Sequence, residues 1–348
     1  MSSIDAAAQL VTLVDEFMRK QTGAFGAVQP ECELKFGTRG VRPITKINFD
    51  NVICRLLSAG FTIAAARPNS MLRATPQYVD AKTGMTKLSN VRCEIAGLSQ
   101  VQRYCRNNTL PVLGDGTQQA RFVQKTMIRE ADGGVPIANP VDFDDFNFRV
   151  TLHNETTLDP NKSPLARGTI DAWRESKKVF RYITRTTMRH PTLPIVADLS
   201  VVKESNRRGP RLVPEYSVAD SGVFDNREKY EIELEVDAAS LGFGPGDRDA
   251  GPIAAALRRA ALIVLKGLQE TNFPVSYPEQ SAALDGYIQL FDPSHKGGMR
   301  VFPRQFIGPN PTTLQAVNAA PVNPDSNIPN IRQQYTVTEK ADGARKLL

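Results

Sequence analysis

The feature that most constrains the fold is an acidic stretch at residues 230–237, in which charged and apolar side chains alternate. It reads Tyr-Glu-Ile-Glu-Leu-Glu-Val-Asp. Successive side chains of a β-strand point to opposite faces, so the pattern predicts a strand with one glutamate face and one apolar face. Residues 31–36, Glu-Cys-Glu-Leu-Lys-Phe, show the same alternation near the start of the chain.

The two stretches leave two interpretations open. In the first, they are ordinary half-buried strands whose charged faces lie in water, as amphipathic strands commonly do. In the second, the two charged faces look at each other across a polar interior and hold a metal ion. The remaining strands have to decide between these interpretations.

The composition is that of a globular protein of one large or two medium domains. The 348 residues are 41% hydrophobic and 23% charged, with a net charge of +6 that allows a polyanionic partner. The four cysteines form no C-x-x-C pair and there are only three histidines, which disfavours a zinc site. Neither a signal peptide nor an apolar run of membrane-spanning length is found, so we expect a soluble intracellular protein without a membrane partner.

Four segments have helical periodicity. They are residues 3–20, 50–59, 98–107 and 252–271. Asp50 is the expected N-cap of the second helix, whose apolar stripe would be Ile53, Leu56 and Leu57.

Short strand-like runs dominate between residues 61 and 236. Besides the two acidic stretches, strands are expected at residues 90–95, 146–153, 179–187 and 195–202. Loops are expected at residues 132–145, 158–164 and 205–215, which are rich in Pro, Asp and Asn. Many strands with few intervening helices indicate an antiparallel sheet, sandwich or barrel.

Several of these strands also place polar groups on one face. Arg181 and Arg185 share a side, with Ile183 between them, and Asp198 shares a side with Ser200. One side of residues 149–155 is wholly polar and consists of Arg149, Thr151, His153 and Glu155; Arg92 lies in a further strand. A closed antiparallel barrel with a hydrophilic lumen explains these faces together. The helices at 3–20, 50–59 and 252–271 would then cover the apolar outer faces.

A charged lumen needs internal neutralisation, because an unpaired buried ion costs several kcal/mol. Two glutamate pairs from opposing strands offer hard oxygen ligands that suit Mg²⁺ or Mn²⁺. The arginines and Lys35 remain to bind an anion with several oxygens, because guanidinium groups match phosphate. The lumen is thus equipped for phosphoryl transfer from a polyphosphate to water.

The order of the motifs resembles the triphosphate tunnel metalloenzymes, and most closely the metal-dependent RNA triphosphatase of fungal and large-DNA-virus mRNA capping enzymes. The motifs are Glu-x-Glu-x-Lys, Arg-Tyr-x-x-Arg, Asp-Leu-Ser and Glu-x-Glu-x-Glu, within residues 25–240. The resemblance implies an α+β fold built on an eight-stranded antiparallel tunnel, flanked by helices on the outside. It departs from the family at Ile183, where a basic residue is common, and near Val196, where another is often found.

The resemblance also implies roles for individual residues. Metal ligands would be Glu31, Glu33, Glu233 and Glu235, with Glu231 adjoining them. Arg181 and Arg185 would contact the γ-phosphate. Supporting roles fall to Lys35, Arg92, Arg149, Glu155, Asp198 and Ser200.

A second motif lies at the end of the chain. Lys340-Ala-Asp-Gly-Ala-Arg345 resembles the K-x-D-G-x-R motif of covalent nucleotidyltransferases, in which the lysine attacks the α-phosphate of a nucleotide. In capping, guanylyl transfer follows triphosphatase action, so the two motifs support each other. Because the sequence ends three residues after Arg345, we expect no guanylyl transfer by this chain alone.

We therefore expect a tunnel domain at residues 1–275, a linker at 276–330 and the start of a guanylyltransferase domain at 331–348. The expected activity is removal of the γ-phosphate from the 5′-triphosphate end of nascent mRNA, in infected host cytoplasm or a virion. The alternatives are a tunnel enzyme acting on inorganic triphosphate or nucleoside triphosphates, and a non-catalytic RNA-binding scaffold. In a longer protein, guanylyltransferase and methyltransferase domains would be partners.

Overall fold

The computed structural model describes residues 3–21, 28–37, 42–64, 69–110, 120–128, 139–241, 249–290, 292–296, 313–325 and 328–334. The chain forms two compact units, Met1–Gln280 and Ser281–Leu348. In the second unit, His295 pairs with Asp285 at 2.9 Å, and a short 3-10 helix covers Ala316–Ala319. The first unit contains the expected barrel.

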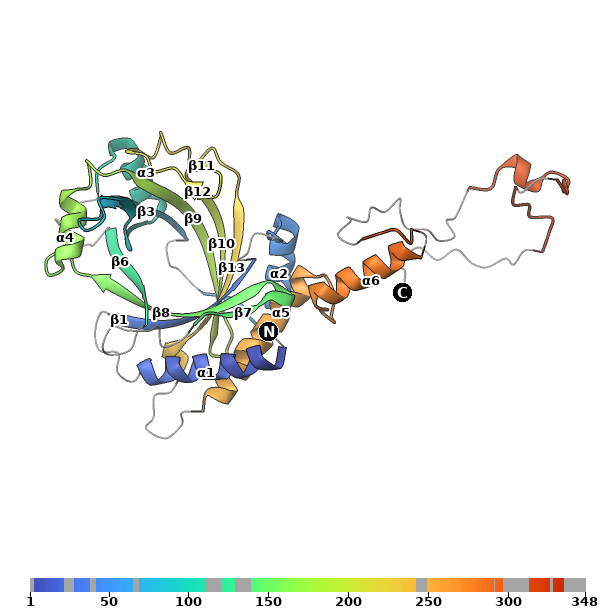
Figure 1. Cartoon of the computed structure of the whole chain (residues 1–348), viewed down its shortest axis with the longest axis horizontal. Helices are drawn as coiled ribbons and strands as arrows, with labels where there is room; N and C mark the ends of the chain where they lie inside the picture. Colours follow the sequence, from blue (N-terminus) through green and yellow to red (C-terminus); the bar gives the residue numbers. More distant parts are fainter. Residues whose placement is uncertain are drawn as a thin grey trace. The chain divides into compact units, whose positions relative to one another are not determined.

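Eight antiparallel strands close into a ring (Figure 1). In order around the ring they are β9 (Lys178–Arg189), β10 (Ile195–Glu204), β13 (Lys229–Val236), β1 (Val28–Phe36), β8 (Phe148–Leu158), β6 (Ala120–Met127), β5 (Val91–Ala96) and β3 (Ser70–Val79). Pairing of β3 with β9 closes the ring. The expected α+β fold with an eight-stranded antiparallel barrel is confirmed.

Further strands extend this ring at its edges. They are β2 (Thr62–Ile63), which pairs with β9; β4 (Thr86–Leu88), which pairs with β3; and β7 (Val141–Phe143), which pairs with β8. A separate hairpin joins β11 (Arg207–Arg208) to β12 (Arg211–Leu212). The loop predictions for 132–145 and 205–215 are therefore wrong where β7, a 3-10 turn at Asp144–Phe146 and this hairpin lie. These elements are too short for periodicity to show them.

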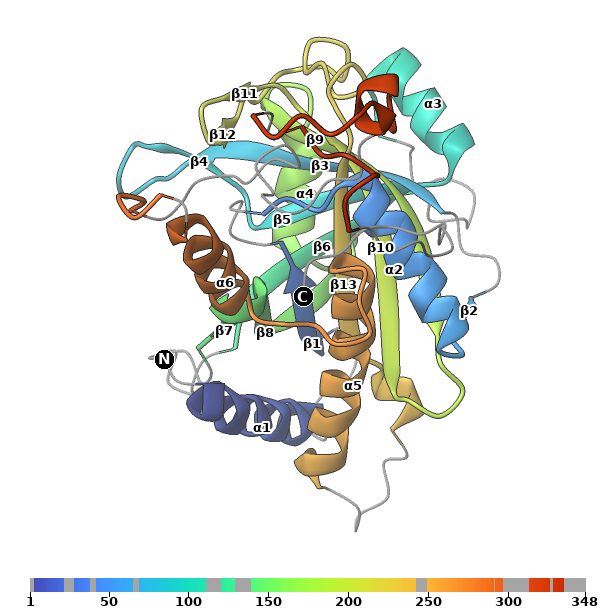
Figure 2. The same ribbon diagram turned by 90° about the vertical axis from the view of Figure 1, so that its right-hand side faces the viewer.

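Three helices pack on the outer apolar faces of one side of the barrel, as expected. They are α1 (Ser3–Gln21), α2 (Lys46–Ser58) and α5 (Ala250–Leu268); Figure 2 shows α5 alongside β13. Val14 and Phe17 of α1 are fully buried in the same cluster as Leu34 of β1 and Leu234 of β13. Burial of one such large side chain stabilises the fold by roughly 2 kcal/mol.

A second cluster covers the opposite outer side. Helices α3 (Leu98–Asn107) and α4 (Pro164–Asp171) lie over strand residues such as Leu72 and Ile95. Within this cluster the indole N–H of Trp173 donates to the Tyr104 hydroxyl at 3.2 Å, so the buried polar groups are satisfied. The two apolar clusters thus take up the outer faces of many barrel strands, and the polar faces point into the lumen.

The start of α2 differs from expectation. Its N-cap is Thr45, whose hydroxyl accepts from the backbone N–H of Asn48, so Asp50 lies inside the helix and pairs with Lys46. The N-cap thus lies five residues earlier than expected. The buried face of the helix consists of Phe49, Val52 and Leu56, whereas Leu57 is 46% exposed. Helix α6 (Tyr277–Gln289) falls in the segment expected to be a linker. Among the described residues, no helix is long and apolar enough to cross a membrane.

Candidate functional site

The expectation that the two acidic motifs oppose each other across the interior is wrong, because they lie side by side on neighbouring strands of the barrel. On neighbouring strands β1 and β13, Glu33 lies opposite Glu235, and Lys35 lies opposite Glu233. We call the lumen-facing charges of these two strands the acidic wall, which consists of Glu31, Glu33, Lys35, Glu231, Glu233 and Glu235. Ion pairs from non-neighbouring strands, such as Lys125 of β6 to Glu31 and Glu33, cross the interior and place these side chains in the lumen.

Two lysines neutralise only part of the acidic wall. The Lys35 ammonium lies 3.0 Å from carboxylate oxygens of both Glu33 and Glu233. The Lys125 ammonium lies 3.0 Å from Glu31 and also contacts Glu33. Among the described residues, Glu235 forms no ion pair.

The pKa values of these carboxylates reflect this uneven neutralisation. Burial, together with the negative charges of Glu31 and Glu33, raises the pKa of Glu235 to about 8. Burial also raises the pKa of Glu31 to about 7, despite the nearby Lys125. Burial acts on Glu33 in the same direction, but Lys35 and Lys125 lower its pKa to about 2. Two carboxylates of the wall thus have too little positive charge around them.

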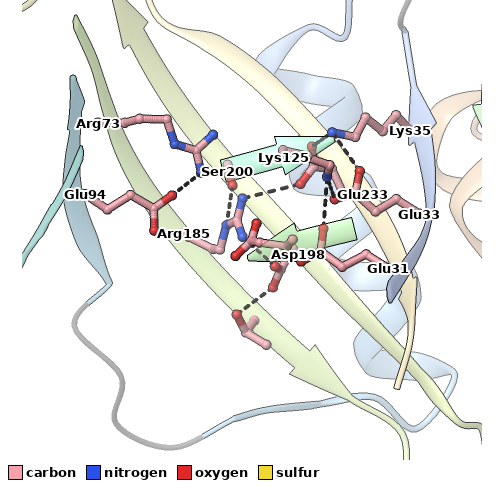
Figure 3. Close-up of polar contacts among 12 residues, drawn as sticks. Glu31, Glu33, Lys35, Arg73, Glu94, Lys125, Arg185, Asp198, Ser200 and Glu233 are labelled. Carbon is pink, nitrogen blue, oxygen red and sulfur yellow. Dashed lines mark hydrogen bonds and ion pairs between the residues drawn. The ribbon is translucent and has the colours of Figure 1, made fainter. Parts of the chain in front are cut away.

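The strands opposite the acidic wall carry the reverse imbalance. Strands β3 and β5 lie four places around the eight-stranded ring from β1 and β13, and they contribute Arg73, Arg92 and Glu94, which we call the basic wall. Arg73 lies 2.9 Å from Glu94, and Arg92 lies 2.8 Å from Glu94 and 2.6 Å from Glu155. Figure 3 shows Arg73 and Glu94 across from Lys35 and Glu33, with Arg185 and Asp198 between them.

Arg73 is crowded by other cations. Burial and the positive charges of Arg92, Arg181 and Arg185 lower its pKa to about 10, and Glu94 only partly compensates. Its Nε is buried and has no hydrogen-bond partner among the described residues. A buried donor without a partner costs about 1–3 kcal/mol. An anion that accepted a hydrogen bond from this Nε would remove that cost, so the position favours anion binding.

Arg185 connects the two walls. Its guanidinium donates to Asp198 at 2.7 Å and to Ser200 at 3.0 Å, and lies 3.3 Å from Glu233. Thr187 donates to the other oxygen of Asp198 at 2.6 Å. The predicted residues Arg185, Asp198 and Ser200 therefore form one network that reaches the acidic wall.

The other predicted residues lie in separate positions around the lumen. Arg181 pairs with Glu231 and, at 3.3 Å, with Glu204, while Glu155 binds Arg92 and Arg121. Arg149 lies opposite Lys35 in the register, but its guanidinium binds Asp142 of β7 at 2.6 Å. Lys340 lies outside the described residues.

Ile183 and Val196, which mark the departures from the family pattern, also lie on the lumen face. Ile183 pairs with Val202, in register with Arg185 and Ser200, and both side chains are buried. Val196, which lies opposite Glu235, is also buried. Three apolar side chains thus occupy lumen positions on β9 and β10.

Two cavities lie toward opposite ends of β13. The first, which we call the hairpin cavity, has a volume of about 740 Å³. Its charged lining consists of Lys35, Arg181, Glu204, Arg207, Glu228, Lys229, Glu231 and Glu233. The second, the acidic cavity, has a volume of about 430 Å³, and its charged lining is Glu31, Arg189, Asp198, Glu235 and Asp237.

The sequence reasoning missed several lumen residues. They are Arg73, Glu94, Arg121, Lys125 and Glu204. Residues 121–125, Arg-Phe-Val-Gln-Lys, place Arg121 and Lys125 on one face of a strand, and this alternation was a usable signal. No comparable signal marked Arg73, because a single arginine in a run that contains Pro76 does not indicate a central strand.

The donor set of the acidic wall fits a hard divalent cation. Among the described residues, no three side chains are gathered as a finished metal site, and the Lys125 ammonium bridges Glu31 and Glu33. Carboxylate oxygens are the ligands that Mg²⁺ and Mn²⁺ prefer. The raised pKa values of Glu31 and Glu235 indicate a local deficit of positive charge, which such an ion would relieve.

Comparisons with known proteins give a likeness of architecture. No family model matches the sequence, and no curated protein matches it. Among solved structures, the chain is similar to the Mimivirus capping enzyme triphosphatase, with a TM-score of 0.46 and 14% identity over 76% of this chain and 99% of that one. It is also similar to the S. pombe Pct1 RNA triphosphatase, with a TM-score of 0.37 and 14% identity over 74% of this chain and 89% of that one. Similarity at this level leaves the chemistry of this chain to its own residues.

Proposed function

We propose that this chain is a metal-dependent polynucleotide 5′-triphosphatase that hydrolyses the γ-phosphate from the triphosphate end of RNA. The observation that carries the proposal is the pair of opposite imbalances in one lumen. The pKa values of Glu235 and Glu31 are raised because the positive charge near them does not offset their burial, whereas Arg73 is crowded by cations. A divalent cation together with a polyphosphate would relieve both imbalances at once.

The acidic wall would hold the cation through Glu31, Glu33, Glu233 and Glu235. A bound Mg²⁺ or Mn²⁺ supplies positive charge that neutralises phosphate oxygens and the developing charge of the transition state. The raised pKa values of Glu31 and Glu235 mean that protons have to leave these carboxylates before they can serve as ligands.

Arginines of the lumen would bind and orient the triphosphate. Arg73 and Arg92 approach from the basic wall, and Arg185 approaches from β9 between the walls. Their guanidinium groups fit phosphate oxygens in bidentate geometry and stabilise the charge that develops as the γ-phosphoryl group transfers. A carboxylate of the acidic wall would orient the attacking water for in-line displacement, so that RNA diphosphate and inorganic phosphate are the products.

Phosphate release tests this proposal directly. Purified protein, shown to be folded by circular dichroism, is incubated with triphosphate-ended RNA in Mg²⁺, in Mn²⁺ and with a chelator. We expect release only with a divalent ion. Absence of release with either ion from folded protein would refute the enzyme assignment and favour a non-catalytic scaffold.

The choice of substrate is tested in the same assay. Tunnel enzymes that act on inorganic triphosphate or on nucleoside triphosphates would use the same lumen. Parallel reactions with ATP and tripolyphosphate therefore accompany the RNA reaction. A kcat/KM that is highest for RNA supports the proposal, whereas equal or higher values for tripolyphosphate or ATP assign the chain to the alternative substrate class.

Lys340 remains a prediction of its own. We propose that it is the nucleophile of a guanylyltransferase domain in a longer protein, where it would form a lysyl-GMP adduct. Incubation of such a protein with labelled GTP would leave a label on the chain, and Lys340→Ala would abolish it. A label that persists in this variant would contradict the role.

A further inference from the structure

The hairpin β11–β12 carries an unusual arrangement of like charges. Arg208 and Arg211 lie directly opposite each other across its two strands, on either side of the turn that Gly209 makes at φ +60°. Like charges in this position destabilise a hairpin. Among the described residues, no carboxylate forms an ion pair with either arginine, and both are exposed.

Arg207 of the same hairpin is used differently. Its guanidinium donates to the Pro210 carbonyl at 2.7 Å and to Glu204 at 2.7 Å. Glu204 is anchored by Arg181 and Lys229 as well, so it ties the hairpin to two barrel strands. The hairpin is thus fixed in place while Arg208 and Arg211 remain available.

The hairpin also borders the lumen. Arg207 and Pro210 line the hairpin cavity beside Arg181 and Lys229. An RNA whose 5′ end lies in the lumen and whose remaining chain extends out through this cavity would therefore run past the hairpin.

The two cavities differ in charge, which sets the direction of entry. Four cations and four carboxylates line the hairpin cavity, whereas one cation and four carboxylates line the acidic cavity. Even with the charges of Glu31 and Glu235 neutralised by a bound cation, the acidic cavity retains two carboxylates against Arg189 alone. A polyanion is therefore repelled less at the hairpin cavity, and the exposed Arg208 and Arg211 attract it there.

We propose that the β11–β12 hairpin binds the single-stranded RNA that follows the triphosphate, through Arg208 and Arg211, as the 5′ end enters by the hairpin cavity. This inference rests on the proposed function. Guanidinium groups bind backbone phosphates in a fork, and they provide affinity without sequence preference. Inorganic triphosphate has no such tail, so the hairpin would favour RNA over it.

The first experiment measures binding of a labelled single-stranded RNA with a 5′-hydroxyl end, by fluorescence anisotropy. This probe lacks the triphosphate, so it reports on the RNA chain alone. We expect R208A/R211A to weaken binding roughly 10-fold at low salt, and to reduce the salt slope of log K by about 1.4, or about 0.7 for each lost phosphate contact. The matched control R258A/R259A removes two adjacent exposed arginines of α5, which line neither cavity, and should bind as the unsubstituted chain does.

The second experiment compares hydrolysis of triphosphate-ended RNA and tripolyphosphate. R208A/R211A should lower kcat/KM for RNA and leave tripolyphosphate hydrolysis unchanged. Equal RNA binding by the double variant and the unsubstituted chain, or an equal loss on both substrates, would overturn the hairpin's role. If no substrate is hydrolysed while binding still depends on the hairpin, the triphosphatase proposal fails and the RNA-binding role of the hairpin is supported.

Discussion

The acidic wall and the basic wall face each other across one lumen and have opposite defects. On the acidic wall, Glu33 and Glu233 share Lys35, and the pKa values of Glu31 and Glu235 are raised. On the basic wall, Arg73 and Arg92 share Glu94, and the pKa of Arg73 is lowered. This contrast supports the proposal that the lumen takes two ligands of opposite charge, because a single ligand would correct only one wall.

The outer faces of the same strands explain how the fold tolerates this arrangement. Buried ion pairs seldom add net stability, because desolvation offsets the Coulomb attraction. The apolar side chains under α1, α2 and α5, and those under α3 and α4, supply the burial that the lumen cannot. Substitutions in the lumen should therefore affect activity more than folding.

The largest expected effect separates two glutamates of the acidic wall. Glu235→Gln should lower kcat at least ~100-fold, since it removes a ligand oxygen's charge, but it should raise the melting temperature of the metal-free protein by roughly 2 °C or more. Glu33→Gln should lower kcat similarly and should lower the melting temperature, because Lys35 and Lys125 lose their shared partner. Phosphate release and thermal melting in chelator measure the two quantities.

The metal-induced shift in melting temperature is the control for this pair. Mg²⁺ or Mn²⁺ should stabilise the unsubstituted chain and stabilise neither variant to the same extent. If Glu235→Gln retained activity, or destabilised the metal-free protein as Glu33→Gln does, the acidic wall would not be the metal site that we propose.

A smaller effect is expected on the basic wall. Arg73→Met should lower kcat/KM about 10- to 100-fold, the equivalent of one or two charge-assisted hydrogen bonds to phosphate. Glu94 keeps Arg92 and Arg121 as partners, so the protein should stay folded. The matched control is Arg103→Met on the exposed face of α3, which should leave kcat/KM unchanged. A metal-induced melting shift that vanishes in Arg73→Met would contradict the division of labour between the walls.

The acidic wall could be predicted from the sequence because strand periodicity is local. Alternation at 31–36 and 230–237 fixes which side chains share a face, and the closed barrel explains why both faces are charged. The pattern did not predict that the two strands are neighbours or the register that sets Glu33 opposite Glu235, because both depend on long-range pairing. The same local signal placed Arg185, Asp198 and Ser200 in the lumen.

The basic wall could not be predicted in this way, because its composition depends on how the ring closes. Arg73 reaches the lumen only because β3 pairs with both β5 and β9, strands that lie far apart in the chain. Lys125 meets Glu31 and Glu33 across β8, a contact that no local pattern specifies. Short elements such as the β11–β12 hairpin are set by a turn at Gly209 rather than by periodicity.

A third effect, a dependence of stability on pH, separates Glu31 and Glu235 of the acidic wall from Glu94 of the basic wall. Burial is the main reason that Glu31 and Glu235 hold a proton more tightly in the folded chain, with pKa values of about 7 and about 8 against 4.5. The folded state therefore binds more protons, and the free energy of unfolding should fall as pH rises from about 5 to 8. On the basic wall, Arg73 and Arg92 overcome the effect of burial and lower the pKa of Glu94 to about 2, so its contribution is lost only below pH 4.5.

Urea denaturation in chelator between pH 3 and 8 should therefore show maximal stability near pH 5. Burial lowers the pKa of His153, which acts in the opposite direction, so His153→Gln should steepen the fall above pH 5. Glu235→Gln should make the fall shallower, because one of the two responsible carboxylates is gone. Divalent metal should flatten it further, since the ion competes with protons for the same oxygens. A stability that stays level from pH 5 to 8 in both the unsubstituted chain and His153→Gln would mean that the acidic wall is already neutralised without metal, and the contrast between the walls would be lost.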